Sequence, residues 1–154
     1  MWSYIIVIAV LFMLGTASKA LAYVNGSPAE IDLMPLAAPN QFFFMRRAAA
    51  DAFKRMLDHA ARDGLVLRVT SAFRSMDEQG RLYALYKQGE GNLAARPGFS
   101  NHQSGIAVDI ETGGFGSRIY QWLAVNAGAY GYVNTGASFS QKEPWHWEYR
   151  KGVV

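Results

Sequence analysis

The chain has 154 residues, of which 51% are hydrophobic, which is enough for one domain with a buried core but too little for two. The net charge is +3 and no run of Lys and Arg is longer than two residues, so the sequence lacks the basic footprint of a nucleic-acid-binding protein. The absence of cysteine excludes disulfides, thiolate-bound zinc and a cysteine nucleophile, so a transition-metal site must use carboxylates and some of the three histidines.

The N-terminal residues have the pattern of a targeting segment. Residues 4–14 form a continuous apolar run that is shorter than the ~20 residues of a membrane-spanning helix. Residues 20–22, Ala-Leu-Ala, have the A-x-A form that signal peptidase favours. We predict that residues 1–22 are a signal peptide, with an uncleaved signal anchor as the alternative, because no Lys or Arg precedes the apolar run. Both interpretations place the rest of the chain outside the cytoplasm.

Residues 23–40 are predicted to be an extended lead-in, because Gly and Pro interrupt them four times. The first helix is expected to run from Asn40, as its N-cap, to about Asp63, with Gly64 ending it. Apolar side chains recur there at helical spacing and are predicted to face the core: Met45, Ala49, Phe53, Met56, Leu57 and Ala60. His59 lies on the same helix without a partner motif, and we expect an ordinary boundary histidine.

Residues 65–73 alternate and are rich in β-formers, which predicts a strand. Ser75 and Glu78 form a capping box that starts a helix running to about Gln88. The remaining pattern predicts a strand, a helix capped by Ser117 and two closing strands, at residues 106–110, 117–129, 130–133 and 145–149. This order indicates a single small α+β domain, with helices packed on a central, mainly antiparallel sheet.

Two segments carry the residues that can do chemistry, residues 100–110 and 143–147. A catalytic zinc site needs three protein ligands and an open position, and His102, Asp109 and His146 supply side chains of the correct types. The alternative is that His102 is an ordinary loop histidine and that His146 packs among aromatic residues.

The spacing of these residues agrees with one site without requiring it. His102 and Asp109 are seven residues apart, an offset that puts side chains on opposite faces of a regular strand, so a bend at Gly105 is needed to bring them together. Glu143 precedes a proline that restricts its backbone, and it lies three residues before His146. Its carboxylate could therefore lie beside a metal without binding it.

Longer segments extend the pattern over residues 48–150. They are SAFRS after a helix, Gln79 and Leu82 in the next helix, PGFSNHQSGIAVDI, a Trp-Leu helix ending in YGY, and EPWHWEYR. Within them, S-x-H-x-x-G-x-A-x-D is matched at Ser100, His102, Gly105, Ala107 and Asp109. In these segments the chain resembles the zinc D-alanyl-D-alanine carboxypeptidases of the VanY type.

The resemblance implies a zinc metallopeptidase that hydrolyses the terminal D-Ala-D-Ala bond of peptidoglycan stem peptides. It implies one zinc ion and a small α+β domain of the Hedgehog/DD-peptidase type over residues 41–154. The roles that it implies are metal ligands for His102, Asp109 and His146, general base for Glu143, cationic stabiliser for Arg74, and substrate contacts for Ser100 and Gln103. Gln103 is also a candidate support for the neighbouring ligand.

The implied partner is the stem peptide. We expect no binding of nucleic acid, and contact with the membrane only through a possible N-terminal anchor. We expect a monomer that acts outside the cytoplasm, in the periplasm or cell envelope, either secreted or anchored at its N-terminus.

Two alternatives remain at this point. One is a zinc endopeptidase that cuts the L-Ala-D-Glu bond of the stem peptide, and the EPWHW and YGY segments favour the carboxypeptidase over it. The other is a non-catalytic wall-binding module, against which Glu143 argues, because an acid that is not a ligand has little structural reason to lie there. No S-x-x-K occurs, which excludes a serine mechanism of the penicillin-binding-protein kind.

Overall fold

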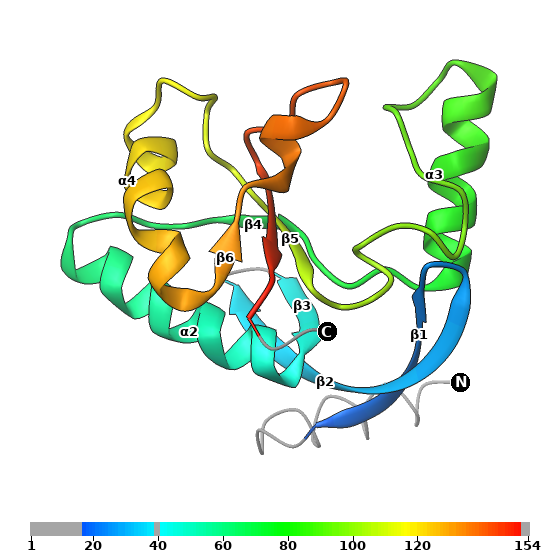
Figure 1. Ribbon diagram of the computed structural model, residues 1–154, viewed down its shortest axis with the longest axis horizontal. Helices are drawn as coiled ribbons and strands as arrows, with labels where there is room; N and C mark the ends of the chain where they lie inside the picture. Colours follow the sequence, from blue (N-terminus) through cyan, green and yellow to red (C-terminus); the bar gives the residue numbers. More distant parts are fainter. Residues whose placement is uncertain (1–16, 39–40, 152–154) are drawn as a thin grey trace.

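The computed structural model describes residues 17–38 and 41–151, whose strands form two antiparallel sheets (Figure 1). The first sheet has the order β1-β2-β3 and is built from β1 (Ser18–Val24), β2 (Ser27–Ala38) and β3 (Gln41–Arg46). The second has the order β4-β5-β7-β6 and is built from β4 (Val69–Ser71), β5 (Ala107–Ile110), β7 (His146–Tyr149) and β6 (Tyr132–Val133). The predicted α+β class with mainly antiparallel pairing is confirmed.

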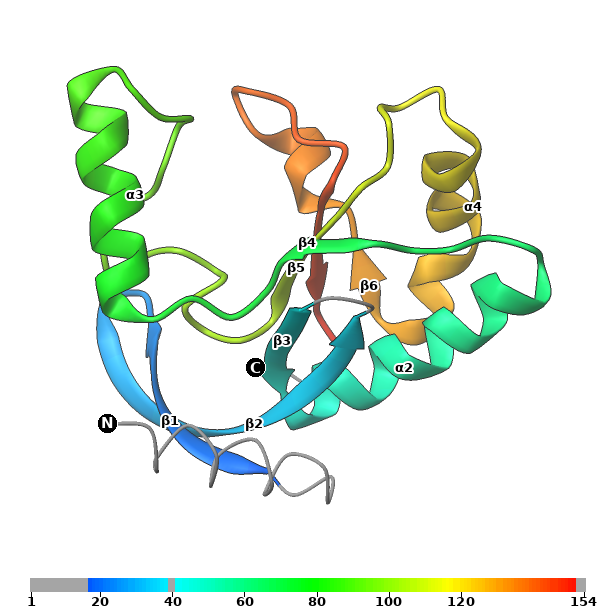
Figure 2. The ribbon, with the colours of Figure 1, turned by 180° about the vertical axis from the view of Figure 1, so that it is seen from behind.

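The described residues contain three α-helices, which are α2 (Arg47–Arg62), α3 (Met76–Gln88) and α4 (Arg118–Asn126), and two 3₁₀ turns, η1 (Ala127–Tyr130) and η2 (Thr135–Ser138). Figures 1 and 2 show α2 and α4 towards one end of the molecule and α3 at the other. Within residues 17–38 and 41–151, no helix has the length and apolar character to cross a bilayer. The apolar run at residues 4–14 lies outside the described residues.

Local capping signals define α3 and α4 as the sequence predicts. Ser75 Oγ accepts a hydrogen bond from the backbone N–H of Glu78, and Glu78 Oε2 accepts one from the backbone N–H of Ser75, which completes the capping box of α3. Gly89, with φ at +77°, ends this helix in the left-handed conformation. Ser117 caps α4 by accepting from the backbone N–H of Tyr120.

The predicted lead-in at residues 23–40 is extended, but it forms paired strands rather than a connecting segment. Asn25 and Gly26 both have positive φ, at 50° and 84°, and form the tight turn between β1 and β2. Asn-Gly is the preferred pair for such a hairpin turn, so these residues begin a new strand instead of breaking structure. Pro35 fits in β2 because β1 pairs with β2 only as far as Leu33, so no strand of the described residues pairs with that side of the proline.

The first helix starts later than the sequence pattern predicts, at Arg47, and Asn40 lies outside the described residues. Residues 41–46 form β3 instead, because the Phe-rich segment pairs along its whole length with β2. The helix ends at Arg62, and Gly64 follows with φ at +72°, as expected for its stop signal. The strand predicted at residues 65–73 is paired only from Val69 to Ser71.

The larger of two hydrophobic clusters in the described residues lies between α2 and the two sheets. The helix buries a stripe of side chains that are at most 1% exposed: Ala49, Ala50, Ala52, Phe53, Met56 and Ala60. Phe53 packs edge-on against Tyr132 of β6, with ring centroids 5.6 Å apart. The hydroxyl of Tyr132 donates to the carbonyl of Ala49 at 2.7 Å, so its polar end is satisfied inside the core.

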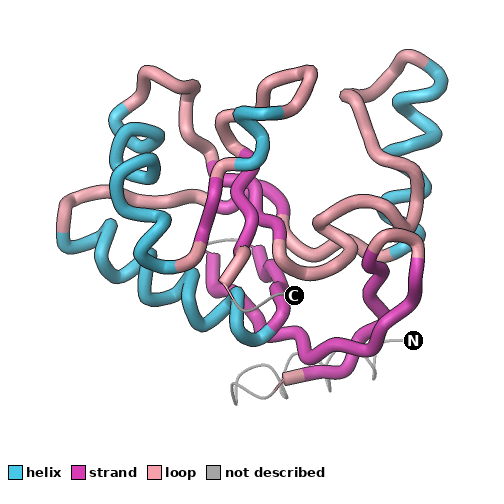
Figure 3. Tube along the Cα trace, in the orientation of Figure 1, coloured by secondary structure: helices cyan, strands magenta, loops and turns pink. Residues whose placement is uncertain are grey.

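The first sheet supports the segment at residues 98–105, which carries a predicted ligand. The backbone N–H groups of Tyr23, Gly26 and Arg46 donate to the carbonyls of Gln103, Gly98 and Gly105 at 3.0, 2.9 and 2.8 Å, respectively. Gly105 also lies so close to Ile31 that a Cβ there would be 2.9 Å from its Cδ1. Figure 3 shows the strands of this sheet beneath the loops of the upper half of the molecule.

A cut after Ala22, at the predicted signal-peptidase site, would divide β1. We therefore expect a chain that begins at Tyr23 to have a lower melting temperature than one that begins at Ala17, because it loses most of the β1–β2 pairing and the burial of Ala22. Thermal denaturation followed by circular dichroism compares the two chains. Equal melting temperatures would show that β1 does not stabilise the domain.

Candidate metal centre

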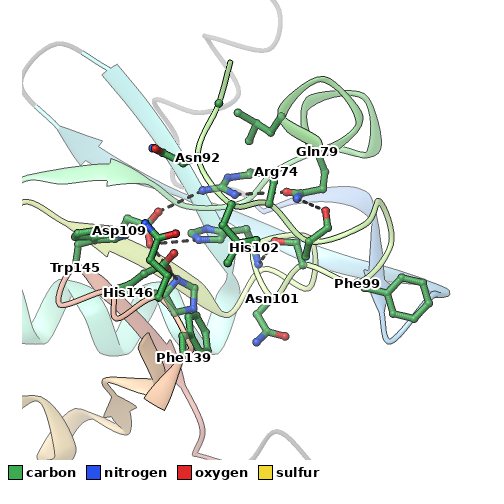
Figure 4. Close-up of a pocket in the computed structure, with 18 of the residues that line it drawn as sticks. Arg74, Gln79, Asn92, Phe99, Asn101, His102, Asp109, Phe139, Trp145 and His146 are labelled. Atoms are coloured by element: carbon green, nitrogen blue, oxygen red, sulfur yellow. Dashed lines mark hydrogen bonds and ion pairs between the residues drawn. The ribbon is translucent and has the colours of Figure 1, made fainter. Parts of the chain in front are cut away.

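The pairing of β5 with β7 places two of the predicted ligands side by side. Asp109 of β5 lies opposite His146 of β7 in the antiparallel register. His102 lies in the turn at residues 101–105 before β5, and Gly105, with φ at +76°, provides the predicted bend. Figure 4 shows the three side chains directed at one another.

The three side chains converge through one donor atom each. Asp109 Oδ1 lies 3.0 Å from His146 Nδ1 and 3.3 Å from His102 Nε2. These donor atoms lie within 4.8 Å of one another, and all three residues are buried. Among residues 17–38 and 41–151, this is the one group of His, Asp and Glu with such spacing. Two imidazole nitrogens and a carboxylate oxygen form a common ligand set for catalytic zinc.

The outer ring nitrogens of both histidines are hydrogen-bonded, which decides which nitrogen can face a metal. His102 Nδ1 lies 2.8 Å from the carbonyl oxygen of Ala72, and a proton donated there leaves Nε2 free. His146 Nε2 lies 3.0 Å from Glu148 Oε1, and a proton donated there leaves Nδ1 free. Such hydrogen bonds orient metal-binding histidines. The donor set and its surroundings therefore fit a metal ion.

The charges in the centre also suit a cation. Burial alone would raise the pKa of Asp109, but its hydrogen bonds with His102 and His146 outweigh this and hold that pKa well below its usual range. Burial lowers the pKa of His102, which favours the neutral ring. Arg74 Nη2 lies 3.3 Å from the second oxygen of Asp109. An ionised carboxylate and a neutral imidazole are the forms that bind metals.

His146 differs from His102 because it lies between two carboxylates. Burial alone would lower the pKa of His146, but its hydrogen bonds with Asp109 and Glu148 raise this pKa to about 9. The metal-free ring therefore carries a proton on both nitrogens at neutral pH. A metal ion that binds Nδ1 must displace one of these protons.

Glu143 lies beside the three ligands without joining them. Its Oε2 is 4.0 Å from His146 Nδ1, and its side chain, which is 20% exposed, lines the cavity above the centre. Burial raises the pKa of Glu143 above its ordinary value, although the nearby His146 acts in the opposite direction. Its backbone N–H donates to the carbonyl of Gly136 at 2.9 Å, which fixes the residue at the edge of the site. A carboxylate with a raised pKa is suited to accept and return a proton.

The cavity above the centre has a volume of about 700 Å³. His102, Asp109 and His146 all line it, together with Arg74 and Glu143. Its remaining wall residues come from α3, from the loop after α3 and from the segment before β7. The predicted ligands, base and cationic residue therefore share one cavity that is large enough for a small peptide.

The two predicted substrate contacts differ in position. Ser100 lines the cavity, and its Oγ accepts a hydrogen bond from the backbone N–H of His102 at 3.3 Å. Gln103 is 0% exposed and does not line the cavity, because its Oε1 points back to accept from the backbone N–H of Gly98 at 2.7 Å. The structure thus gives Gln103 the supporting position and not the substrate-facing one.

His59 lies on α2, away from this centre, as the sequence analysis expects. Its side chain is 31% exposed, its Nδ1 is 3.0 Å from the hydroxyl of Tyr130, and its ring packs edge-on against Trp122. It is a boundary histidine that joins α2 to α4 and η1.

Gln79 and Glu148 contact predicted site residues, although the sequence analysis assigned neither of them a role. Gln79 of α3 is 1% exposed and accepts a hydrogen bond from Arg74 Nη1 at 3.4 Å, while its amide donates to the carbonyl of Ala95 at 2.8 Å. Glu148 lies two residues after His146 on β7. The alternation of His146, Trp147 and Glu148 in a strand could have shown that the first and third share a face.

Comparisons with known proteins agree with this geometry. The sequence model of the VanY family, described as D-alanyl-D-alanine carboxypeptidase, matches residues 43–152. A D-alanyl-D-alanine carboxypeptidase of Enterococcus faecalis is 31% identical over 120 residues, which cover 61% of this chain and 44% of that protein. The peptidoglycan L-alanyl-D-glutamate endopeptidase CwlK of Bacillus subtilis is 30% identical over 107 residues, 68% of this chain and 61% of that one. The chain therefore spans less than two thirds of either relative.

Two solved structures share the fold. One is a variant of the D,D-pentapeptidase VanY in complex with Zn(II), with a TM-score of 0.60 and 25% identity, covering 77% of this chain and 78% of that one. The other is VanYB in complex with D-alanine-D-alanine, with a TM-score of 0.62 and 25% identity, covering 79% of this chain and 78% of that one.

In the presence of a chelator, we expect the free energy of unfolding to fall as the pH rises from about 7 to 9. The pKa of His146 in the folded protein is raised to about 9 from an ordinary 6.5. Protonated His146 therefore stabilises the fold fully below pH 6.5, and this stabilisation is lost as the pH rises through about 9. Such a pKa shift corresponds to a change in the free energy of unfolding on the order of 3 kcal/mol. Urea denaturation at a series of pH values measures it. The His146→Gln variant is the control, and an equal pH dependence in both proteins would contradict the assignment.

Proposed function

Because the chain belongs to the VanY family of D-alanyl-D-alanine carboxypeptidases, we propose that it is a zinc D,D-carboxypeptidase that removes the terminal D-alanine of peptidoglycan stem peptides. The observation that carries the proposal is the convergence of His102 Nε2, Asp109 Oδ1 and His146 Nδ1 at the base of a cavity, with the Glu143 carboxylate beside them. The complexes of two relatives with Zn(II) and with D-alanine-D-alanine support the choice of metal and substrate.

The three donor atoms would hold one zinc ion, because they meet around a single point. When bound, zinc supplies a Lewis acid for the peptide carbonyl and lowers the pKa of water towards ~7. The protein contributes the fixed positions of the ligands, which come from the second sheet and from the outer hydrogen bonds of both histidines.

Glu143 is the general base in this proposal, and afterwards the general acid. Its carboxylate takes a proton from the attacking water, and it then gives that proton to the amine of the departing D-alanine. The raised pKa of Glu143 brings it closer to that of the groups with which it exchanges protons. Its exposure to the cavity allows water and substrate to reach it.

Arg74 supplies the positive charge on the same side of the cavity. Its Nε donates to Ser71 Oγ at 3.0 Å, and its two terminal nitrogens donate to Gln79 and Asp109. These three contacts hold the guanidinium against the cavity wall. We propose that it stabilises the negative charge that develops on the scissile carbonyl oxygen.

We propose that the enzyme acts outside the cytoplasm, in the cell envelope, on the stem peptide and as a monomer. The similarity to the endopeptidase CwlK favours one alternative, a cut between L-alanine and D-glutamate in the same peptide. The two activities differ in one requirement, because a carboxypeptidase needs a free terminal carboxylate.

We expect the purified chain to release D-alanine from a pentapeptide ending in D-Ala-D-Ala when zinc is present. We expect the chelated enzyme and the Glu143→Gln variant to release D-alanine about 10²–10⁴-fold more slowly. The chelated enzyme lacks its metal, and the variant lacks the carboxylate that transfers the proton. Chromatographic detection of D-alanine measures the rate. The same peptide with an amidated C-terminus is the control: hydrolysis of the amidated peptide at an internal bond would establish the endopeptidase in place of the carboxypeptidase.

An Arg74→Ala variant is expected to lower kcat and kcat/KM together by about 10²–10³-fold, because it removes a contact that strengthens only as charge develops on the carbonyl oxygen. Steady-state kinetics on the same pentapeptide measure both constants. Arg68→Ala, at an exposed position outside the cavity, is the matched control. A raised KM with unchanged kcat would instead assign Arg74 to binding of the substrate carboxylate.

A further inference from the structure

Glu148 is a buried carboxylate that has no part in the reaction proposed above. Its side chain is 0% exposed, although a carboxylate in such a position is costly unless other groups compensate its charge. It also lies on the far side of His146 from the cavity, since it contacts Nε2 while Asp109 contacts Nδ1. Direct contact with the substrate is therefore not its role.

Three donors surround this carboxylate. Glu148 Oε1 accepts from His146 Nε2 at 3.0 Å and from Asn101 Nδ2 at 2.6 Å. Its other oxygen accepts from the guanidinium of Arg150. With these donors, which include the guanidinium of Arg150 and the protonated ring of metal-free His146, the carboxylate can remain ionised inside the protein.

The strand register places Glu148 where it can act on His146. His146 and Glu148 are two residues apart on β7, so their side chains share a face of the sheet. Ala107 of β5 lies opposite Glu148, just as Asp109 lies opposite His146. A methyl side chain at the position of Ala107 leaves room on this face for the carboxylate and its donors.

We propose that Glu148 is a positioning residue of the metal centre, which keeps a proton on His146 Nε2 so that Nδ1 faces the metal. The inference rests on the metal site of the proposed function. Two carboxylates compete for the protons of this ring, because Asp109 Oδ1 is 3.0 Å from Nδ1 and Glu148 Oε1 is 3.0 Å from Nε2. Without Glu148, Asp109 would hold the single proton of the neutral ring at Nδ1 and block the ligand atom.

Glu148 also joins the two segments that carry the histidine ligands. Asn101 immediately precedes His102, and its amide donates to the same Oε1 that receives the proton of His146. The other ligand, His102, uses a neutral backbone carbonyl, that of Ala72, as its outer acceptor. The two histidines are thus oriented differently, because the outer ring nitrogen of His146 meets a carboxylate side chain and that of His102 meets a backbone carbonyl.

The test uses zinc affinity and the imidazole proton as readouts in addition to activity. Competition with a chromogenic chelator gives the Kd for zinc of the full chain and of Glu148→Ala, Glu148→Gln and Glu111→Ala. Nitrogen-15 NMR of histidine-labelled protein, zinc-free and zinc-loaded, shows the state of each ring nitrogen, and the chain has only three histidines to assign. Glu111 is the matched control, since it is exposed and follows β5.

We expect zinc to bind Glu148→Ala about 10–100-fold more weakly than the unmodified chain or Glu111→Ala. Glu148→Gln keeps an oxygen acceptor of the same shape, so its loss should be smaller, and it carries the test if the alanine variant does not fold. A downfield His146 Nε2–H resonance should be present in the unmodified chain and shifted upfield in both variants, most in the alanine variant.

Zinc affinity within about twofold of the unmodified chain in both Glu148 variants, or an unchanged His146 Nε2–H resonance, would overturn the inference. Failure of the proposed function is a separate result. An unmodified chain that binds no zinc or releases no D-alanine would refute that function, while the resonance of the zinc-free chain would still test the contact between Glu148 and His146.

Discussion

The antiparallel register of β5 and β7 sets the geometry on which the site depends. Because Asp109 lies opposite His146, and Ala107 opposite Glu148, one pair of short strands positions two of the predicted ligands and the carboxylate that contacts the outer nitrogen of His146. A slip of one residue would turn these side chains to the other face of the sheet. Trp147, which lies between His146 and Glu148 on β7, is 2% exposed and packs in the core. Such a slip would therefore also expose its indole ring and bury charged side chains in its place.

The charge balance explains why such a polar centre can be buried. Around the three converging donor atoms, the described residues place the carboxylates of Asp109, Glu143 and Glu148 and the guanidinium groups of Arg74 and Arg150. The carboxylates are in excess, so the centre favours an added cation. In the metal-free protein, the protonation of His146 supplies it, which is why the pKa of that ring is raised to about 9. A divalent ion would replace that proton and bring a larger charge to the same place.

Sequence patterns could predict the features that depend on neighbouring residues. The capping box of α3 and the Ser117 cap of α4 lie within a few residues of each helix start, and the resemblance singles out the three predicted metal ligands. The first sheet was not predicted, because its strands are stabilised by pairing between residues far apart in sequence, and the Asn25-Gly26 turn was taken as a break. The sequence left the orientation of Gln103 open for a related reason. A side chain beside a ligand can point to the cavity or away from it, and here the backbone of Gly98 binds it on the inner side.

The base of the cavity and its walls come from different parts of the fold. The ligands lie on the second sheet and on a loop that the first sheet supports through backbone hydrogen bonds. The walls come from α3, the loop after it and the segment before β7, and their apolar side chains are 36–48% exposed: Leu82, Leu85, Leu93, Phe99, Phe139 and Trp145. Exposed apolar groups around a polar base are the usual composition of a ligand site. In the proposed function, proton transfer and metal binding would therefore depend on the sheets, whereas the choice among peptide bonds would depend on these walls, which can differ between relatives that share the same base.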